Sequence, residues 1–397
     1  MRDDFAILNN DLIYLDNSAT TFKPNEVISK MNEYYTKYTA NSHRGDYDLS
    51  QKVDYEYEST REVVRDFINA SQKEEIIFTS GTTESLNMII FGFMKYYLKK
   101  GDEVLITKAE HASNVLPWFE LEREIGIVVK YIPLTSEYKV TLDNLKKVMT
   151  NKTKVVSLAY VSNVIGDIRP IHEISKYIHS KDILLVVDGA QSVPHMKTNV
   201  ILDDIDFLAF SAHKMLGPTG VGVLYAKQKY LEVMHPLMYG GGMNTLFEST
   251  KEVEYKSLPL RLEAGTRNIA GVIGLKAAIL YLKKIGMDKI NKHEKDLKKY
   301  LIQKLTEIDN ITVYNKTSES GIVIFNLNGI FSEDTSRYLN HYHICVRAGN
   351  HCTKMIKDDL KIKNTCRISL YLYNTKDEID KLIEVLRNSK DIYDIIL

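Results

Sequence analysis

Short apolar runs alternate with helix-length segments along most of this chain. Seven runs rich in β-branched and aromatic residues lie at residues 76–78, 103–107, 128–132, 154–160, 183–187, 207–210 and 221–225. Most are separated by segments whose apolar residues recur near the helical period, such as residues 83–97 and 172–179. This alternation predicts an α/β fold in which a mostly parallel, seven-stranded sheet is wrapped by helices.

The pattern changes near residue 270. A long helical stretch at 271–308 precedes short strands at 322–326 and 344–347 and a closing helix at 376–386, which predicts a smaller C-terminal α+β domain. We expect a large domain at residues 15–265 and a small domain formed by residues 1–14 and 266–397. Because no linker rich in Pro, Gly and Ser separates them, the two domains are expected to pack closely.

The composition excludes several classes of function. Among 397 residues, 52 Lys and Arg balance 52 Asp and Glu, so no strong field draws the chain to nucleic acid or to a membrane surface. The N-terminus lacks the features of a signal peptide, and no segment has membrane-spanning length, so we expect a cytoplasmic protein. The three cysteines, an odd number near one end, predict reduced thiols and not a disulfide framework.

Two consecutive apolar runs end on residues that suit a cofactor. The first ends at Asp188, and the second continues through Ser211 and His213 to Lys214. The carboxyl ends of strands are where ligands bind in α/β sheets. An acid and a lysine at that edge suit pyridoxal phosphate (PLP), which binds a lysine through its aldehyde and pairs its ring nitrogen with an acid. A strand can also end in Asp for no chemical reason, so other residues must decide.

The turn at residues 78–84 is a candidate phosphate site. It contains Gly81, Thr82 and Thr83 where a strand passes into a helix, and helix starts of this kind offer backbone N–H groups and hydroxyls to anions. An ordinary helix cap uses the same residues. A histidine, His111, follows another strand and is placed to stack on a ring and exchange protons, although a lone histidine is more often a capping or packing residue.

Six segments resemble, in order, the class V aminotransferase family of fold-type I PLP enzymes, nearly from end to end. They lie at residues 14–21, 41–45, 81–84, 187–191, 211–214 and 263–266. The resemblance implies that Lys214 binds the cofactor covalently, Asp188 pairs with the ring nitrogen, His111 stacks on the ring, and Gln191 bonds the ring hydroxyl. The implied phosphate ligands are Thr82, Thr83, Ser211 and His213, with Thr266 supplied by the partner in a homodimer with shared active sites.

The C-terminal region narrows the resemblance. Cys352 lies in an Arg-x-Gly-x-x-Cys segment that begins at Arg347 and is similar to the nucleophile loop of group II cysteine desulfurases and selenocysteine lyases, the SufS-like branch. Cys345 and Cys366 lie in apolar runs typical of buried packing residues. By the same resemblance Arg367 binds the substrate carboxylate, a task that suits its planar fork. Asn163 and Arg44 are the other expected substrate-binding residues.

The resemblance implies a PLP-dependent enzyme that converts L-cysteine to L-alanine. Lys214, Cys352 and His111 would be catalytic, and Cys352 would carry the sulfur as a persulfide for an acceptor protein, with iron–sulfur cluster assembly as the expected destination. The alternatives are a selenocysteine lyase and a non-catalytic scaffold that binds a sulfur carrier. The segments around Cys352 depart from the branch: Asn350 stands where many members have histidine, and residues 331–334 lack the histidine that some members use for transfer to a zinc-bearing acceptor.

A metal site is the remaining alternative for this region. His341, His343, His351 and Cys352 lie close together in the sequence, and an extended strand would place the first two on one face. The third and fourth adjoin each other, which is not a usual zinc-ligand spacing. We therefore expect no metal.

Overall fold

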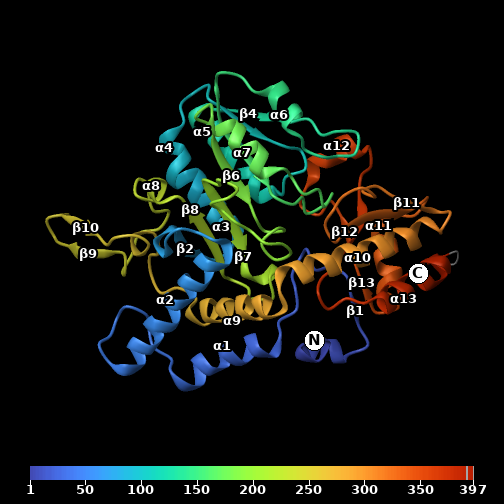
Figure 1. The fold of residues 1–397 in the computed structure, drawn as a ribbon, viewed down its shortest axis with the longest axis horizontal. Coiled ribbons are helices and arrows are strands. Elements are labelled where there is room, and N and C mark those ends of the chain that lie inside the picture. The colour runs from blue at the N-terminus through green and yellow to red at the C-terminus, as the bar shows by residue number, and fades with distance from the viewer. Residues whose placement is uncertain (390–391, 397) are drawn as a thin grey trace.

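The seven apolar runs form one sheet in the computed structural model, which describes residues 1–389 and 392–396 (Figure 1). The strands are β2 (Ile76–Thr79), β3 (Glu103–Ile106), β4 (Val128–Tyr131), β5 (Thr153–Ala159), β6 (Leu184–Asp188), β7 (Phe207–Ser211) and β8 (Gly222–Ala226). Their order is β2-β8-β7-β6-β5-β3-β4, and only the pairings of β8 with β2 and with β7 are antiparallel. The predicted α/β class with a mostly parallel seven-stranded sheet is confirmed.

Helices cover both faces of this sheet. One face carries α1 (Asn25–Lys37), α2 (Asp48–Ile68), α6 (Leu142–Val148), α7 (Ile171–His179) and α9 (Ile269–Ile285). The other carries α3 (Thr82–Asn87), the π-helical segment Met88–Met94, α4 (Lys95–Tyr97), α5 (Leu116–Ile125) and α8 (Gln228–Leu231). Successive strand residues point to opposite faces, so Leu208 and Phe210 of β7 join the first core while Phe207 and Ala209 join the second.

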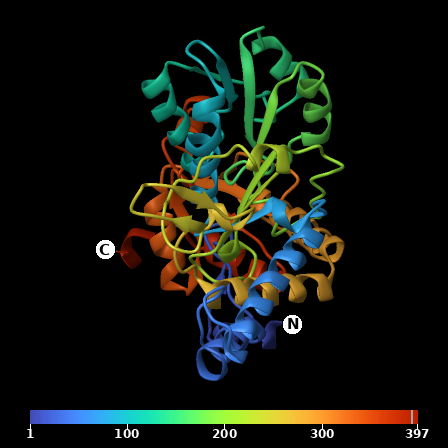
Figure 2. The same ribbon diagram turned by 90° about the vertical axis from the view of Figure 1, so that its left-hand side faces the viewer.

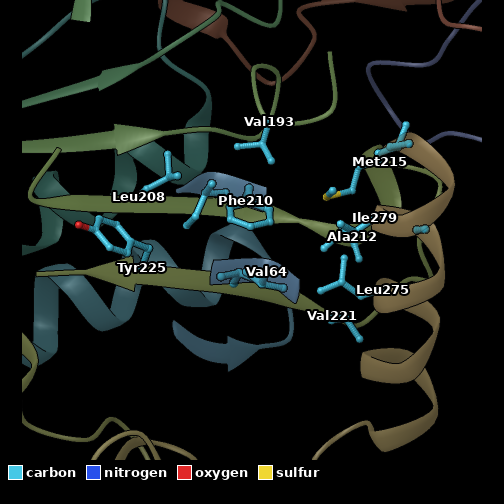
Figure 3. Close-up of a cluster of buried hydrophobic side chains, with 14 of the residues drawn as sticks. Val64, Val193, Leu208, Phe210, Ala212, Met215, Val221, Tyr225, Leu275 and Ile279 are labelled. Atoms are coloured by element: carbon cyan, nitrogen blue, oxygen red, sulfur yellow. The ribbon is translucent and has the colours of Figure 1, made fainter. Parts of the chain in front are cut away.

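The core beside α9 supports the end of β7. Figure 3 shows Leu275 and Ile279 of α9 beside Ala212, Met215 and Val221, the residues that follow β7 and precede β8. All five are fully or almost fully buried. Close packing against α9 leaves the segment between β7 and β8 little freedom to move. This segment carries Lys214, so α9 helps to fix the position of that residue.

One predicted helix is divided in the structure, and another is continuous but changes its hydrogen-bonding pattern. The stretch expected at 271–308 is two helices, α9 and α10 (Met287–Thr306), because Gly286 separates them with φ 96°, a backbone conformation that favours glycine. The helix expected at 83–97 passes from α3 through a π-helical segment into α4.

The C-terminal region forms a second, antiparallel sheet in the order β11-β12-β15-β14. Its strands are β11 (Ile311–Val313), β12 (Ile322–Leu327), β14 (Arg347–Gly349) and β15 (Thr365–Ser369), covered by α10, α11 (Ser332–His341), α13 (Lys376–Arg387) and α14 (Ile392–Ile396). The strand expected at 344–347 is divided, because β13 (Ile344–Cys345) pairs in parallel with β1 (Ile13–Tyr14) while β14 pairs with β15. Short helix α12 (Lys357–Leu360) lies between β14 and β15 in the chain.

A long hairpin extends from the body of the molecule. It consists of β9 (Asn244–Phe247) and β10 (Val253–Tyr255), projects at the left edge of Figure 1 and points toward the viewer in Figure 2. Within the described residues, no helix has the length and apolar character needed to cross a membrane. The division into domains at residues 15–265 and 1–14 with 266–397 stays a prediction.

Candidate active site

A cavity of about 190 Å³ opens at the carboxyl edge of the large sheet, beside the smaller sheet. Most of the residues selected from the sequence line it. These are Thr82, Thr83, His111, Asn163, Asp188, Gln191, Ser211, His213, Lys214 and Arg367. The strands β5, β6 and β7 all end at this edge, which explains why residues distant in the sequence meet here.

Lys214 and Asp188 give the cavity its strongest electrostatic features. Burial lowers the pKa of Lys214 to about 8, because the charged ammonium loses hydration, while Asp188 opposes this shift. Burial also raises the pKa of Asp188. Two groups oppose this rise: the N–H of Ala190, which donates to Asp188 Oδ1 at 2.9 Å, and the positive charge of Lys214. A buried acid with one backbone donor is prepared to receive a cation.

The turn between β2 and α3 forms a cradle of hydroxyls and amides. Ser211 Oγ accepts from the backbone N–H of Thr82 at 2.7 Å and lies 2.7 Å from Thr82 Oγ1. The backbone of the turn also lies close to β8 at Gly81. Residue 222 of β8 must therefore be glycine, because a Cβ there would lie 2.4 Å from the Cα of Gly81. Thr83 Oγ1 lies 2.8 Å from Ser113 Oγ, which connects the cradle to the loop that carries His111.

The ring nitrogens of His111 have distinct roles. The backbone N–H of Ser113 donates to His111 Nδ1 at 3.1 Å, so Nδ1 is unprotonated and the neutral ring carries its proton on Nε2. Burial, assisted by the positive charges of Lys214, Arg347 and Arg367, lowers the pKa of His111 to about 4. The ring is therefore neutral near pH 7. Burial likewise lowers the pKa of His213 to about 4, with Lys214 and Lys23 contributing.

Gln191 presents an unsatisfied acceptor to the cavity. Its Nε2 donates to the carbonyl of Ser18 at 2.8 Å, whereas its Oε1 is buried and has no hydrogen-bond partner. Buried oxygens without partners are rare in proteins, and one that lines a cavity is a candidate ligand contact.

The N-terminal segment supports the site from the side. The backbone carbonyl of His213 accepts from the N–H of Thr21 at 2.9 Å and from the hydroxyls of Thr20 and Thr21, both at 3.1 Å. Residues 14–21 were noted in the sequence only as a matching segment, without a role. In the structure they brace the residue that precedes Lys214.

Cys352 lies on a loop at the rim of the cavity. Its side chain is exposed, its φ is 58°, and Arg347 Nη2 donates to its Sγ at 3.3 Å. The backbone N–H of Ala112 donates to the carbonyl of Cys352 at 2.8 Å, which attaches this loop to the loop of His111. The cavity is lined by Arg347, the first residue of β14, and by His351, which precedes Cys352 on the loop.

Asn163 is hydrogen-bonded to the loop that carries Cys352. Its Nδ2 donates to the carbonyl of His351 at 2.8 Å, and its Oδ1 accepts from Thr353 Oγ1 at 2.9 Å. Asn163 is buried, so these two bonds connect the end of β5 to both neighbours of Cys352. This tethering role was not evident in the sequence, from which Asn163 was expected to bind substrate.

Arg367 is held by two partners and retains free donors. Its Nη2 donates to Asp16 Oδ1 at 2.8 Å and its Nη1 donates to the carbonyl of Asn163 at 3.0 Å, while its buried Nε has no partner. Burial lowers the pKa of Arg367, and Asp16 opposes that shift. Arg347 is its direct neighbour across the β14–β15 pair, so two guanidinium groups stand at one wall of the cavity.

Two predicted site residues lie outside this cavity. Arg44 and Thr266 are exposed and do not line it. They are close to one another in the fold, since Asn41 Nδ2 donates to Thr266 Oγ1 at 3.1 Å and Arg44 lies against Gly241 and Gly242.

The strand geometry imagined for His341 and His343 is wrong. His341 ends helix α11 because residues 332–341 follow the helical period, and His343 lies beyond that helix with φ 58°. Among the described residues, no group of three or more His, Cys, Asp and Glu side chains is placed to hold a metal ion.

Comparisons with known proteins cover nearly the whole chain. The family described as Aminotransferase class-V matches residues 13–382. A probable cysteine desulfurase of Halalkalibacterium halodurans is 42% identical over 393 residues, which are 98% of this chain and 96% of that protein. A probable cysteine desulfurase of Staphylococcus epidermidis is 40% identical over 397 residues, with the same coverage.

Solved structures agree with this assignment. The apo structure of the cysteine desulfurase from Thermococcus onnurineus has a TM-score of 0.94 at 37% identity and covers 98% of this chain and 96% of its own. The cysteine desulfurase CsdA from Escherichia coli, solved in an S-sulfonic acid form, has a TM-score of 0.93 at 33% identity and covers 98% of each chain.

Proposed function

The chain belongs to the class-V aminotransferase family, and from that premise we propose that it is a PLP-dependent cysteine desulfurase. The observation that carries the proposal is the position of Cys352 at the rim of the cavity. The guanidinium of Arg347 donates to its sulfur, and its backbone carbonyl accepts from Ala112 of the His111 loop. The names of the relatives and solved structures support the same activity.

The residues around the cavity fit PLP, and we call Lys214, Asp188, Gln191, His111 and the cradle of Thr82 and Ser211 the cofactor seat. Asp188 offers a buried carboxylate to a ring nitrogen, and the unpartnered Gln191 Oε1 matches a ring hydroxyl. The cradle offers hydroxyls and an amide to a phosphate. When bound, the cofactor supplies an aldehyde that condenses with amines and a ring that accepts electrons from the substrate carbon.

Lys214 acts as the base of the reaction. With a pKa of about 8, roughly a tenth of the population holds a neutral amine at pH 7, against less than about a thousandth for a lysine of ordinary pKa, and that amine can take a proton from the substrate and later return it. A lysine with an ordinary pKa would remain protonated. Neutral His111, with its proton on Nε2, acts as a hydrogen-bond donor to groups in the cavity.

Arg367 binds the carboxylate of L-cysteine. Its Nε–H and the remaining N–H groups are free for a forked contact, while Asp16 and the carbonyl of Asn163 keep the guanidinium plane in place. This anchor orients the substrate thiol toward Cys352 on the neighbouring loop.

Cys352 then takes the sulfur. Its thiolate attacks the substrate sulfur, an S–S bond forms, and the C–S bond breaks with its electron pair passing to carbon, which gains a proton. The products are L-alanine and a persulfide on Cys352, so no external oxidant is required. Arg347, as a donor to Sγ, stabilises the anionic sulfur.

Cys352, Arg347 and Arg367 together form what we call the sulfur-accepting side. The persulfide is handed to an acceptor protein, with iron–sulfur cluster assembly as the proposed destination, in the cytoplasm. We also propose a homodimer in which Thr266 and Arg44, exposed here, reach the partner's active site. Sedimentation of the purified protein tests the dimer, and a monomer with full activity would contradict it.

The function is tested by mass analysis after exposure of the PLP-loaded protein to L-cysteine. We expect a sulfur adduct on Cys352 and release of alanine. Cys352→Ala should keep the cofactor absorbance and lose both the adduct and the sulfide released by reductant. Cys345→Ala, which removes a partly buried thiol, is the matched control and should behave as wild type. Unchanged sulfide release from Cys352→Ala would overturn the proposal, and rates with L-selenocysteine distinguish a selenocysteine lyase.

A further inference from the structure

The residue before His111 is a buried glutamate with an unusually complete set of partners. Glu110 is 1% exposed. Its Oε1 accepts from Thr107 Oγ1 at 2.7 Å and from Arg169 Nη1, and its Oε2 accepts from Asn114 Nδ2 at 3.0 Å and from the backbone N–H of Ala159 at 2.7 Å. Four donors fill the four lone-pair positions of a carboxylate.

This set of partners requires an ionised carboxylate. All four groups donate in the observed arrangement, and an amide in place of the carboxylate would direct an NH₂ group at donors on one side. Arg169 is 2% exposed and also donates to the carbonyl of Ala159 at 3.0 Å, so the charge of Glu110 is balanced within the network. That balance matters because Asp188 lies close enough for both charges to influence its pKa.

The network holds both ends of the His111 loop. Glu110 precedes His111 and is bonded to the end of β5 at Ala159, and Asn114 follows Ser113 and accepts from Ser157 Oγ of the same strand at 2.7 Å. Between these anchors, the N–H of Asn114 donates to the carbonyl of His111 at 2.8 Å and the N–H of Ser113 donates to His111 Nδ1. The orientation and the tautomer of His111 therefore depend on this turn.

The outer side of the same loop holds the nucleophile. The N–H of Ala112, two residues from Glu110, donates to the carbonyl of Cys352. A displacement of the Glu110 anchor would thus move the imidazole and the peptide of Cys352 together.

We propose that Glu110, through its network with Arg169 and Asn114, is a positioning residue that holds His111 in a single tautomer within the cofactor seat and holds Cys352 beside it. The catalytic consequence rests on the proposed function. The effect on His111 does not, because it belongs to the protein without cofactor.

The test compares Glu110→Gln with a matched variant, Glu103→Gln. Glu103 is also a buried carboxylate of the β3 region, but it lies at the opposite end of that strand, where it bonds Lys130 at 2.6 Å, Thr150 at 2.7 Å and Thr153 at 3.2 Å. Nitrogen-15 NMR of the imidazole rings, recorded at pH 7 on the apoprotein, reports the tautomer of His111, whose signal is assigned by its loss in His111→Gln.

We expect one Nε2–H tautomer in wild type and in Glu103→Gln, and averaging between both neutral tautomers in Glu110→Gln. In the loaded enzyme, Glu110→Gln should lower kcat roughly 10- to 100-fold, the size of effect that a misplacement of about 1 Å produces. The KM for L-cysteine should change little because Arg367 is untouched. A single tautomer in Glu110→Gln, with a kcat no lower than that of Glu103→Gln, would overturn the proposal.

A second variant guards against misfolding. Asn114→Ala retains the pair of Glu110 and Arg169 and removes one anchor of the turn, so tautomer averaging is expected there too. If Glu110→Gln does not fold, a single tautomer in Asn114→Ala overturns the proposal. Wild type without desulfurase activity, but with tautomer averaging in the variants, would refute the proposed function and leave the positioning role of Glu110 standing.

Discussion

The cofactor seat and the sulfur-accepting side meet in one cavity but are built differently. The seat consists of strand ends and short turns of one sheet, with Asp188 and Ser211 as last residues of their strands. The sulfur-accepting side consists of a cross-strand pair, Arg347 and Arg367, and an exposed cysteine on a loop. Bonds from Asn163 and Ala112 attach this loop to the segments that follow β5 and β3.

This difference separates two tasks. A buried seat shifts the pKa values of Lys214 and Asp188, as proton transfer and charge storage require. An exposed rim keeps Cys352 accessible to an acceptor. Substitutions on one side should therefore leave the properties of the other side measurable, and the following predictions test that independence.

The largest effect is expected from Lys214→Ala. Loss of the base should lower alanine release at least about 10³-fold, within the range for a general base. Iodoacetamide labelling of Cys352 should remain at the wild-type rate if the two sides are independent. Lys298→Met, which removes a buried lysine bonded to Ser318 outside the cavity, is the control. Alanine release at the wild-type rate would refute the role of Lys214.

The next effect is expected from Arg367→Lys. Lysine keeps a positive charge but loses the planar fork, so KM for L-cysteine should rise roughly 10- to 100-fold, as for loss of a charged hydrogen bond worth about 1.5–3 kcal/mol. Arg347→Lys is the paired control because it lies directly across the strands and contacts sulfur. Steady-state kinetics should show a KM change for Arg367→Lys only. Equal KM changes would mean that the two guanidinium groups share the carboxylate.

Gly222→Ala tests the seat alone. A Cβ at this position would lie 2.4 Å from the backbone of Gly81, so the cradle must widen. Overpacking of this kind costs about 1–3 kcal/mol, and we expect a roughly tenfold rise in the PLP dissociation constant. Gly274→Ala, whose Cβ would meet the side chains of Met31 at 3.0 Å and Pro218 at 3.2 Å, should change this constant little because neither residue belongs to the seat. Fluorescence titration of the apoprotein measures both, and equal constants would contradict the cradle.

Asn163→Ala tests the attachment of the loop. It removes the bonds to His351 and Thr353, each worth about 0.5–1.5 kcal/mol. We expect several-fold faster hydrogen exchange at residues 350–353 and slower persulfide formation, with the PLP dissociation constant nearly unchanged. The control is Asn144→Ala in α6, which removes the bond from Asn144 Nδ2 to the carbonyl of Pro133. Unchanged exchange at 350–353 would mean that Ala112 alone orders the loop.

The last prediction concerns the stability of the apoprotein as a function of pH, and not the reaction. Burial lowers the pKa of Lys214 from 10.5 to about 8 in the folded state, so between these values the unfolded chain binds more protons. The free energy of unfolding should therefore rise between pH 8 and pH 10.5, by on the order of 1–3 kcal/mol. Urea unfolding of wild type and Lys214→Met should show this rise as a difference between the two. Parallel profiles would contradict the shift.

The sheet could be predicted from sequence because its signal is local. Each of the seven runs matches an observed strand to within two residues, since buried strands of a parallel sheet are short apolar runs bounded by turns. The division of the helical stretch at Gly286 had a local signal as well, a glycine within a helical pattern.

The site was predictable where chemistry follows directly after a strand. Asp188, Ser211 and Lys214 each follow an apolar run, so their meeting at one edge is a consequence of topology. The hydrogen bond between Asp16 and Arg367 joins residues 351 apart in the sequence, and the sequence of neither segment indicates that the other is its partner. The same holds for Asn163, whose tether reaches 188 residues to His351. Such partners depend on how two sheets pack, which no local pattern encodes.

The bond from Ala112 to the carbonyl of Cys352 has a consequence for sulfur delivery. A nucleophile on a long, unattached loop could travel to its acceptor, as a swinging arm does. Here the backbone around Cys352 is hydrogen-bonded to Ala112 and to Asn163, which restrains it and favours motion by rotation of the short side chain. In the proposed reaction the persulfide sulfur therefore stays at the rim of the cavity, and the acceptor must bring its own thiol there. The rate of transfer then depends on how well the surface of the acceptor fits the surface around Cys352, so shape complementarity selects the acceptor.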